Sequence, residues 1–569
     1  MKNETQLILM IAVTILLSPL FSSGQNIPVP LDKKMQMHHE MPGDKYLPNQ
    51  FNNKLTSPPL RYKITGIFTA QVNVNASGQN ILGDAGNEPN IAVNPLNPNR
   101  IVIGWRQFDD VNSNFRQAGW SYTSDAGQTW TFPGVIEPGI FRSDPVLDYD
   151  SAGNFYYNSL TSDVTYHCKV FKSNNGGAIW DAGVEAKGGD KQWMTIDRTQ
   201  GVGSGNIYSS WTSYYSSCPP GFFTRSTDGG SSFEDCVYVG GNPYWGTMAV
   251  GNDGELYIDG SGQYDGIVVA KSTNAQIPGS LISWDFPVSV EMDGYITGNS
   301  PINPVGILGQ ANIDVDRSNG PGRGNVYVLA SVQRLSNSDP GDVMFAKSTD
   351  GGQTWSFPIQ INDDPGMINT QWFGTMSVAP NGRIDAVWLD TRDAPPGSDL
   401  SALYYSYSTN QGDTWSVNEK LSDSFDPHIG YPQQDKMGDY FDMESGNTGA
   451  HLAWANTLNG EEDVYYSFIN PLITGTGDIP KTDNYLSVTC YPNPFRDLTT
   501  IRYQIPGEGV VKLSVYNVYG QEITTLVNKK QTAGIYNVTF SADMLPAGYY
   551  FCRLTPGAHS ETTRLVIMK

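Results

Sequence analysis

The chain has 569 residues, of which 39% are hydrophobic and 12% aromatic, so it is long enough to bury a large core. Its 57 acidic and 35 basic side chains give a formal net charge of -22. That charge argues against nucleic acid or bare anionic membrane as a partner, and leaves only local positive clusters to hold an acidic ligand.

The first 24 residues have the pattern of a secretory signal. A short charged start is followed by an apolar run from Leu7 to Leu17 and by Ser22-Ser23-Gly24, so we expect cleavage before Gln25. The apolar run is too short for a comfortable membrane span, and no later stretch is long enough. We therefore expect an exported, soluble mature protein without a transmembrane helix.

Residues 25–60 are rich in Pro, Asn and Lys and show little periodic apolar pattern, which predicts a flexible leader. Within it, the run Met35-Gln-Met-His-His-Glu-Met41 has side chains that suit a soft metal such as copper. Because no second set of ligands is spaced along the leader, an accidental solvated cluster is the favoured interpretation.

An eight-residue turn, Ser/Thr-x-Asp/Asn-x-Gly-x-x-aromatic, recurs through the middle of the chain. Intact copies begin at Thr123, Ser173, Ser226, Ser348 and Ser408, and a broken copy runs from Ser272 to Trp284. The side chains at its third place are Asp125, Asn175, Asp228, Asp350 and Asn410. They can bond their own backbone, and the glycine accepts positive φ, so each copy joins two antiparallel strands. Spacings of 46 to 76 residues fit one four-stranded sheet per copy.

A second motif, two apolar strands joined by a Gly or Asn turn, gives the number of sheets. Its seven copies begin at Glu88, Asp144, Gln192, Tyr244, Gln310, Phe373 and Asp439. We predict an all-β fold, a seven-bladed β-propeller over residues 61–472, with six blades as the alternative. Because a ring must close, the segment Tyr62–Val74 is expected to complete the last blade and to remove its exposed edge.

After a linker at residues 473–484, residues 485–569 change to short alternating strands, which predicts a small Ig-like β-sandwich. Its motifs, in order, are Tyr491-Pro-Asn-Pro494, Tyr516-x-x-x-Gly520, Gly534-Ile-Tyr536 and a final Lys569. This block resembles the type A sorting domain of the type IX secretion system of Bacteroidetes. The resemblance implies transport by that machinery, removal of the domain by its sortase, and release or attachment at the outer-membrane surface. Residues 474–480 are the expected place for the cut.

The five cysteines are odd in number. Cys218 and Cys236 can bridge within one blade, Cys490 and Cys552 can staple the sandwich, and Cys168 is then left over. We expect none of them to act in catalysis.

The recurring turns resemble the Asp boxes, or BNR repeats, of sialidases and related propellers, over about residues 85–470. In that family the boxes lie on the outer, lower side of the ring, away from the substrate. The resemblance therefore implies that Asp125, Asp228 and Asp350 are structural, which their own backbone bonds also explain.

If each box joins the third and fourth strands at the bottom, the starts of the inner strands gather at the opposite, top mouth. The side chains predicted to bind a ligand there are Glu88, Asp190, Trp193, Trp245, Gln310, Trp372, Asp390 and Asp439. Aromatic platforms and carboxylates are what sugar binding uses. Glu88 and Asp144, each followed by proline, have an alternative role as backbone partners at the start of an inner strand.

The sialidase resemblance also implies an arginine trio around a sugar carboxylate, a tyrosine nucleophile and an aspartate acid. The candidates are Arg106, Arg142 and Arg392 for the trio, Tyr440 for the nucleophile, and Asp109 or Asp144 for the acid. The family's early Arg-Ile-Pro signature is missing, and the propeller has no arginine after Arg392. An alternative is that Arg392 pairs with its flanking carboxylates and only rigidifies its loop.

Several carboxylates facing one channel repel each other unless protons or a cation neutralise them, so we consider a calcium ion in or near the mouth. The sequence predicts an exported surface or secreted propeller that binds a glycan or glycoprotein through the top mouth. The alternatives are an exo-sialidase or related glycoside hydrolase, and a structural adhesin. Three arginines close to one carboxylate would favour the enzyme, whereas arginines that each pair with their own acid would count against it.

Overall fold

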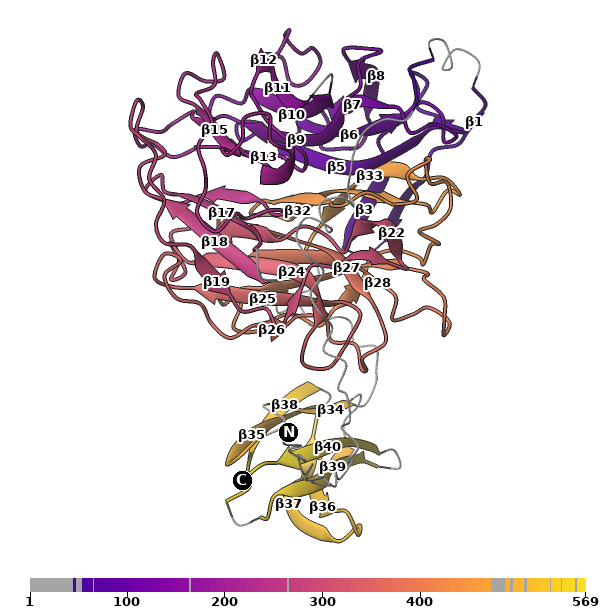
Figure 1. Cartoon of the computed structure of the whole chain (residues 1–569). Coiled ribbons are helices and arrows are strands. Elements are labelled where there is room, and N and C mark those ends of the chain that lie inside the picture. The colour runs from indigo at the N-terminus through magenta and orange to yellow at the C-terminus, as the bar shows by residue number, and fades with distance from the viewer. Residues whose placement is uncertain are drawn as a thin grey trace, which may run out of the picture. The chain divides into compact units, whose positions relative to one another are not determined.

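The structure, a computed structural model, describes residues 44–47, 54–64, 66–162, 165–262, 266–471, 487–491, 495–505, 509–532, 534–543, 545–557 and 560–569. The chain divides into two compact units, Met1–Pro471 and Leu472–Lys569, and each is described by itself (Figure 1). The predicted signal, the methionine and histidine run and the predicted linker lie outside the described residues.

The first unit is built from antiparallel sheets that follow one another along the chain, and in the first three the turns at Thr123, Ser173 and Ser226 begin where the third strand ends. The first sheet holds β5 (Ala85–Val93), β6 (Ile101–Phe108), β7 (Arg116–Thr123) and β8 (Thr131–Ile136). The second holds β9 (Ser143–Tyr149), β10 (Phe155–Ser162), β11 (Tyr166–Ser173) and β12 (Val184–Glu185). The third holds β13 (Trp193–Ile196), β14 (Ile207–Ser210) and β15 (Phe223–Ser226), with a short 3-10 helix at Ser213–Tyr215.

The next three sheets repeat this order. The fourth sheet holds β16 (Met248–Val250), β17 (Leu256–Ser261), β18 (Ile267–Ser272) and β19 (Val288–Val290). The fifth holds β23 (Asn312–Val315), β24 (Val326–Arg334), β25 (Asp342–Ser348) and β26 (Ile359–Gln360), and β20 (Gly294–Tyr295) also pairs with β24. The sixth holds β27 (Gln371–Val378), β28 (Ile384–Asp390), β29 (Ala402–Ser408) and β30 (Glu419–Lys420).

The seventh sheet joins the two ends of the first unit. It holds β31 (Asp442–Ser445), β32 (Ala450–Asn456), β33 (Asp463–Ile469), β3 (Ile67–Gln71) and β2 (Arg61–Ile64). Strand β3 pairs antiparallel with β33, with Ile67 opposite Ile469. The predicted closure by the segment Tyr62–Val74 is therefore confirmed, and the edge of β33 is covered. Two small ribbons complete the unit, β1 (Thr56–Ser57) with β4 (Asn80–Ile81) and β21 (Gly298–Ser300) with β22 (Asn303–Ile307).

The first strands of the seven sheets contact one another in a cycle. The contacts run from β5 to β9, β13, β16, β23, β27, β31 and back to β5. These strands are mostly buried, and neighbouring ones run in the same direction, as in β31 and β5, where Asp442 accepts from Ile91 N and Glu444 accepts from Val93 N. Side chains of all seven strands line one cavity, and we call the space between these strands the channel, with the strand starts at one end and the strand ends at the other.

The recurring turns fasten each sheet to the preceding one. Asp125 Oδ1 accepts hydrogen bonds from Thr129 N at 2.8 Å and Thr123 Oγ1 at 2.7 Å, and Asp350 is bonded in the same way by Thr354 N and Ser348 Oγ. Gly127 has φ 81°, and a Cβ there would meet the ring of Tyr466, in the seventh sheet, at 2.2 Å. Glycine is thus required both by its backbone and by close packing across the junction.

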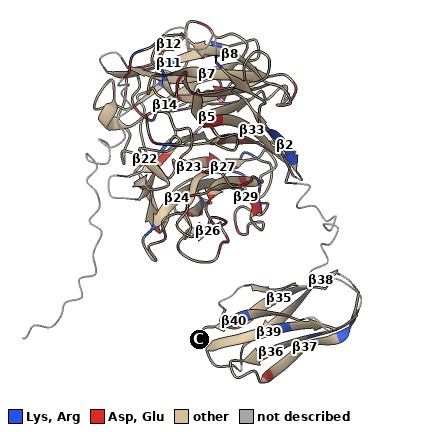
Figure 2. Ribbon diagram, turned by 90° about the vertical axis from the view of Figure 1, so that its right-hand side faces the viewer, with Lys and Arg blue, Asp and Glu red and all other residues tan. Residues whose placement is uncertain are grey.

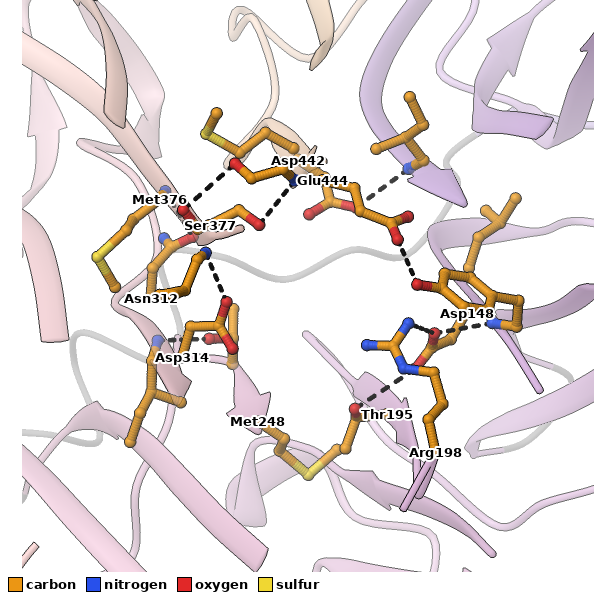
Figure 3. A pocket seen from close by; sticks show the side chains of 18 of the residues that line it. Asp148, Thr195, Arg198, Met248, Asn312, Asp314, Met376, Ser377, Asp442 and Glu444 are labelled. Atoms are coloured by element: carbon orange, nitrogen blue, oxygen red, sulfur yellow. Dashed lines mark hydrogen bonds and ion pairs between the residues drawn. The ribbon is translucent and has the colours of Figure 1, made fainter. Parts of the chain in front are cut away.

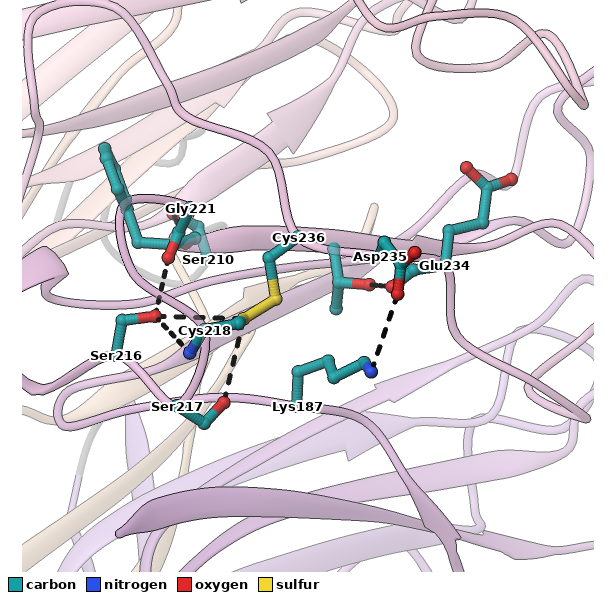
Figure 4. Close-up of a disulfide and its surroundings, with 11 residues drawn as sticks. Lys187, Ser210, Ser216, Ser217, Cys218, Gly221, Glu234, Asp235 and Cys236 are labelled. Carbon is teal, nitrogen blue, oxygen red and sulfur yellow. Dashed lines mark hydrogen bonds and ion pairs between the residues drawn. A yellow bond between two sulfur atoms is a disulfide. The ribbon is translucent and has the colours of Figure 1, made fainter.

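Cys218 and Cys236 form a disulfide beside the third sheet, as predicted (Figure 4).

Acidic and basic positions are interspersed through the ribbon of the first unit (Figure 2). In the part of the chain that the structure describes, no helix is long and apolar enough to cross a membrane.

The second unit is two antiparallel sheets that share one core. One sheet holds β34 (Ser487–Tyr491), β35 (Leu498–Ile505) and β38 (Gly534–Ser541). The other holds β37 (Glu522–Gln531), β36 (Gly509–Asn517), β39 (Gly548–Pro556) and β40 (Glu561–Ile567). Ile501, Leu513 and Leu554 meet between the sheets. The disulfide considered between Cys490 and Cys552 is corrected, because both are free thiols and Cys490 Sγ instead donates to the Arg564 carbonyl.

Candidate functional site

The starts of the inner strands form a buried cluster of charges, which we name the sealed end. Its residues are Glu88, Arg106, Asp144, Lys191, Lys436 and Asp439. The Lys191 ammonium lies 2.7 Å from Asp439, 3.4 Å from Asp144 and 3.7 Å from Glu88. The side chains of these four residues are 0% exposed. A ligand from solvent cannot reach them.

The backbone holds this cluster in place. Glu88, Asp144 and Lys191 have φ of 48°, 46° and 54°, conformations that residues other than glycine seldom adopt. In these conformations the three side chains lie close together at the starts of neighbouring inner strands. Lys436 Nζ also lies there, 2.6 Å from Asp439. Burial disfavours the charged form of Glu88 and raises its pKa, although Arg106, Lys191 and Lys436 lower it.

This burial corrects the roles predicted for the nucleophile Tyr440 and for one of the two acids, Asp144, whereas Asp109 lies outside the cluster and stays a prediction. Tyr440 is buried, donates its hydroxyl to the Pro145 carbonyl at 2.8 Å, and packs edge-on against Trp193. Burial raises the pKa of Tyr440 well above its ordinary value, so it is not activated for attack. Asp144 is committed to Lys191, and Asp109 is half-buried and accepts a hydrogen bond from Gln117 Nε2 at 2.9 Å.

The arginine trio does not assemble around one carboxylate. Arg106 pairs with Glu88 at 3.3 Å, and Arg142 Nε donates to Glu137 at 3.1 Å. Arg392 pairs with Asp390 at 2.8 Å and Asp363 at 2.6 Å, which confirms its alternative role in rigidifying a loop. Each arginine has its own acids, the arrangement that counts against the sialidase hypothesis.

Most of the predicted ligand-binding side chains are part of the interior. Those with 2% exposure or less are Glu88, Asp190, Trp245, Gln310, Trp372, Asp390 and Asp439. Trp372, for example, packs in the core of the sixth and seventh sheets and donates to Ser401 Oγ at 3.1 Å. Trp193 differs, since it is partly exposed and lines a cavity. The predicted open mouth is thus corrected to a closed end.

The cavity lies at the other end of the same channel, and we name it the channel pocket. It has a volume of about 430 Å³ (Figure 3). Figure 3 shows side chains of several inner strands facing one space. Its polar side chains include Asp148, Thr195, Arg198, Thr247, Asn312, Asp314, Ser377, Asp442 and Glu444. Met248, Met376 and Trp193 add apolar wall.

The carboxylates of the channel pocket bond the backbone of the next inner strand. Asp442 Oδ2 accepts from Ile91 N at 3.0 Å, Glu444 Oε2 from Val93 N at 2.9 Å, and Asp148 Oδ2 from Ile196 N at 2.7 Å. Asp314 Oδ2 accepts from Val378 N at 2.8 Å in the same way. Inner-strand edges face the channel and lack a ladder partner, so side chains satisfy their N–H groups.

One side of the channel pocket carries a connected polar group. Tyr149 donates its hydroxyl to Glu444, and the Arg198 guanidinium lies 4.2 Å from the Tyr149 ring centre and donates to Asp148 at 3.1 Å. Burial raises the pKa of Asp442 to about 8 and that of Glu444 to about 7. These two carboxyl groups therefore hold their protons to higher pH than ordinary acids do, and in the structure they accept hydrogen bonds from Ile91 N, Val93 N and Tyr149.

The sequence did carry a signal for these residues. Asn312-Ile-Asp314 and Asp442-Met-Glu444 alternate polar and apolar side chains along an inner strand, which places the polar ones on the channel face. Sequence reasoning placed the site at the strand starts and so missed their ends. In the described ranges, no three His, Cys, Asp or Glu side chains gather as ligands for a metal ion, and lysines and an arginine neutralise the acids of the sealed end.

Comparison with known proteins identifies the end of the chain. Residues 489–568 match the family described as secretion system C-terminal sorting domain. The protein is therefore of the secreted or outer-membrane surface class of Bacteroidetes. No curated protein matches the chain.

Several solved structures are similar to the chain at low identity. A Dyadobacter fermentans protein of unknown function is 13% identical, with a TM-score of 0.39, over 72% of this chain and 100% of that one. PorZ, a surface component of the type-IX secretion system of Porphyromonas gingivalis, is 13% identical, with a TM-score of 0.28, over 90% and 75%. A Hadza microbial sialidase is 11% identical, with a TM-score of 0.34, over 65% and 76%. TM-scores this low carry no argument about activity or ligand.

Proposed function

We propose that the first unit is a seven-bladed β-propeller with Asp-box turns, exported by the type IX route, that binds a glycan or glycoprotein in the channel pocket. The cyclic contact of seven first strands supports the blade count, and the repeated bonding of Asp125, Asp228 and Asp350 supports the Asp-box assignment. We propose the same domain limits as the sequence predicts, with the propeller over residues 61–472 and the sorting domain over 485–569.

The observation that carries the binding proposal is the channel pocket itself. It is blind, because the sealed end closes the channel behind it with buried ion pairs. A polymer cannot thread such a channel, so the pocket would take a chain end. The carboxyl groups of Asp442, Glu444 and Asp148 supply polar partners for hydroxyl groups, and Trp193 supplies an apolar face, which together suit a sugar unit.

The test is binding of the purified full chain to a glycan array, followed by titration of the best glycan. We expect Asp442→Ala and Glu444→Ala each to weaken binding by about tenfold, the loss of roughly one good polar contact. Asp413→Ala, which removes an exposed acid on the sixth sheet, is the matched control and should bind normally. Equal binding by the wild type and both pocket variants would reject the pocket as the site. No bound glycan at all would favour the structural adhesin.

A hydrolase remains the second candidate, because the raised pKa values of Asp442 and Glu444 are what a general acid needs. Tyr149 is not the nucleophile in this hypothesis, since burial raises its pKa well above the ordinary value. The assay is release of a fluorogenic leaving group from sialosides and other glycosides. Turnover by the wild type that is lost in Glu444→Ala would establish the enzyme. A chain that binds a glycan but releases no leaving group would reject it.

A further inference from the structure

A second cavity, of about 560 Å³, opens on the second sheet and shares no residue with the channel pocket. We name it the rim groove. Its lining includes Glu137, Arg142, Thr161, His167, Lys169 and Glu185. These residues come from the segment after β8 and from strands β10, β11 and β12.

Two cations in the rim groove converge on a single carboxylate. Arg142 Nε donates to Glu137 Oε2 at 3.1 Å, and Lys169 Nζ donates to Glu137 Oε1 at 2.7 Å. Arg142 is 2% exposed and Lys169 22%. Both cations also lie against the Phe171 ring, at 4.9 and 5.7 Å from its centre, so their positions are fixed before any ligand arrives.

The carboxylate itself is more exposed than the two cations. Glu137 has φ 51° and starts the turn that Ile140 N closes onto the Glu137 carbonyl at 3.1 Å. Positive φ at a glutamate is strained, and the surrounding contacts must compensate for it. Its side chain is 31% exposed, at the opening of the rim groove. Burial opposes ionisation, but hydrogen bonds from Lys169 and Arg142 hold the pKa of Glu137 below its ordinary value.

We propose that the rim groove is a binding site for the carboxylate of an acidic sugar, held by Arg142 and Lys169, and that Glu137 fills this site when no ligand is bound. At the two cations one carboxylate replaces another, and the displaced Glu137 side chain turns toward solvent. The two oxygens of Glu137 are divided between the arginine and the lysine, which is the geometry that a carboxylate ligand would reproduce. In a chain of net charge -22, such a local cation pair is the kind of place that can hold an acidic ligand.

This site is independent of the proposed glycan binding in the channel pocket. The probe is a trimer of galacturonic acid, titrated by calorimetry into the full chain, with neutral maltotriose as the ligand control. We expect Lys169→Gln to weaken trimer binding about tenfold, because one charge-assisted contact is lost. We expect Glu137→Gln to strengthen binding about fivefold or more, because the internal competitor loses its charge.

Matched variants separate this proposal from a purely structural ion pair. Lys347→Gln removes a lysine at the third strand of another sheet, paired with Asp413, and should leave trimer affinity unchanged. Asp442→Ala should also leave it unchanged, because that side chain belongs to the channel pocket. At one trimer concentration, the melting temperature should rise more for wild type and Glu137→Gln than for Lys169→Gln.

The proposal is overturned if no variant binds the trimer, or if Glu137→Gln binds no more tightly than wild type. Equal affinity in wild type and Lys169→Gln overturns it as well. A Glu137→Gln chain that is less stable yet binds more tightly supports it, since a structural ion pair predicts the first effect without the second.

Discussion

The two ends of the channel are built on the same strands and both carry carboxylates, yet they differ in what those carboxylates contact. At the sealed end, Glu88, Asp144 and Asp439 pair with cations and are 0% exposed. At the channel pocket, Asp442 and Glu444 bond the backbone of the next strand and keep part of their surface open. The comparison teaches that the partners of a carboxylate, more than its place on a strand, decide whether it is available to a ligand.

The largest expected effect is at the sealed end. Lys191→Met removes the cation that pairs with Asp144 and one of the cations that Asp439 and Glu88 contact, and breaking a buried ion pair of this kind costs about 3–5 kcal/mol. The measurement is the free energy of unfolding from denaturant titration. Lys347→Met, a lysine of a more exposed pair, should cost about 1 kcal/mol or less. Equal effects of the two variants would contradict the comparison.

Removing one tyrosine hydroxyl at each end of the channel should give a smaller difference in stability between the two ends. Tyr440→Phe leaves the buried Pro145 carbonyl without its donor, which we expect to cost about 1–3 kcal/mol. Tyr149→Phe removes the donor to Glu444, which is only partly buried and can bond water instead, so we expect about 1 kcal/mol or less. Denaturant titration of both variants measures the difference, and a larger loss for Tyr149→Phe would be evidence against the assignment of the open end.

The pH dependence of stability should report the channel pocket. The pKa of Asp442 rises from 3.8 to about 8 on folding, so the folded chain binds a proton that the unfolded chain has already released. This contribution is fully present below about pH 4 and is lost as the pH rises through about 8. Glu444 acts in the same direction, with a folded pKa of about 7. Melting temperatures across this range should fall less steeply for Asp442→Asn than for wild type, and parallel curves would refute the assignment.

The smallest expected effect lies outside the channel, in the recurring turns. Burial raises the pKa of Asp350, but hydrogen bonds from Thr354 and Ser348 outweigh it and lower that pKa to about 2. This group therefore stabilises the fold above pH 3.8 and loses its contribution as the pH falls toward 2. Asp350→Ala should cost about 0.5–1.5 kcal/mol at neutral pH, measured by denaturant titration. A cost as large as that of Lys191→Met would contradict a role confined to one exposed turn.

The sequence predicted the all-β class and the recurring turns well because the pattern repeats. Thr123 to Trp130 and its copies are local turns, so their glycines and aspartates mark strand ends without knowledge of distant partners. The closure by β3 was also predictable, because an open ring leaves an exposed strand edge.

The site was harder to predict because exposure depends on partners far apart in sequence. Lys191 meets Glu88 and Asp439, residues about 100 and 250 positions away, and no local pattern reveals that meeting. The pairing of Arg392 with Asp390 could be predicted, since the two residues are close together in the sequence. The alternation of polar and apolar residues indicated that Asp442 and Glu444 face the channel. Which end of the channel is open could be decided only once the buried ion pairs of the sealed end were known.

The pairing of Ile67 with Ile469 has a consequence for the order of the chain itself. It brings β3, near the start of the first unit, beside β33, the last strand of that unit, with Asn470 N bonded to the Gly66 carbonyl. A short peptide could therefore join these two ends, and new termini could be cut in an exposed turn such as that at Asn410 without removing a ladder bond. The position of the chain ends is then not essential to the first unit, and a circular permutant should keep both the sealed end and the channel pocket.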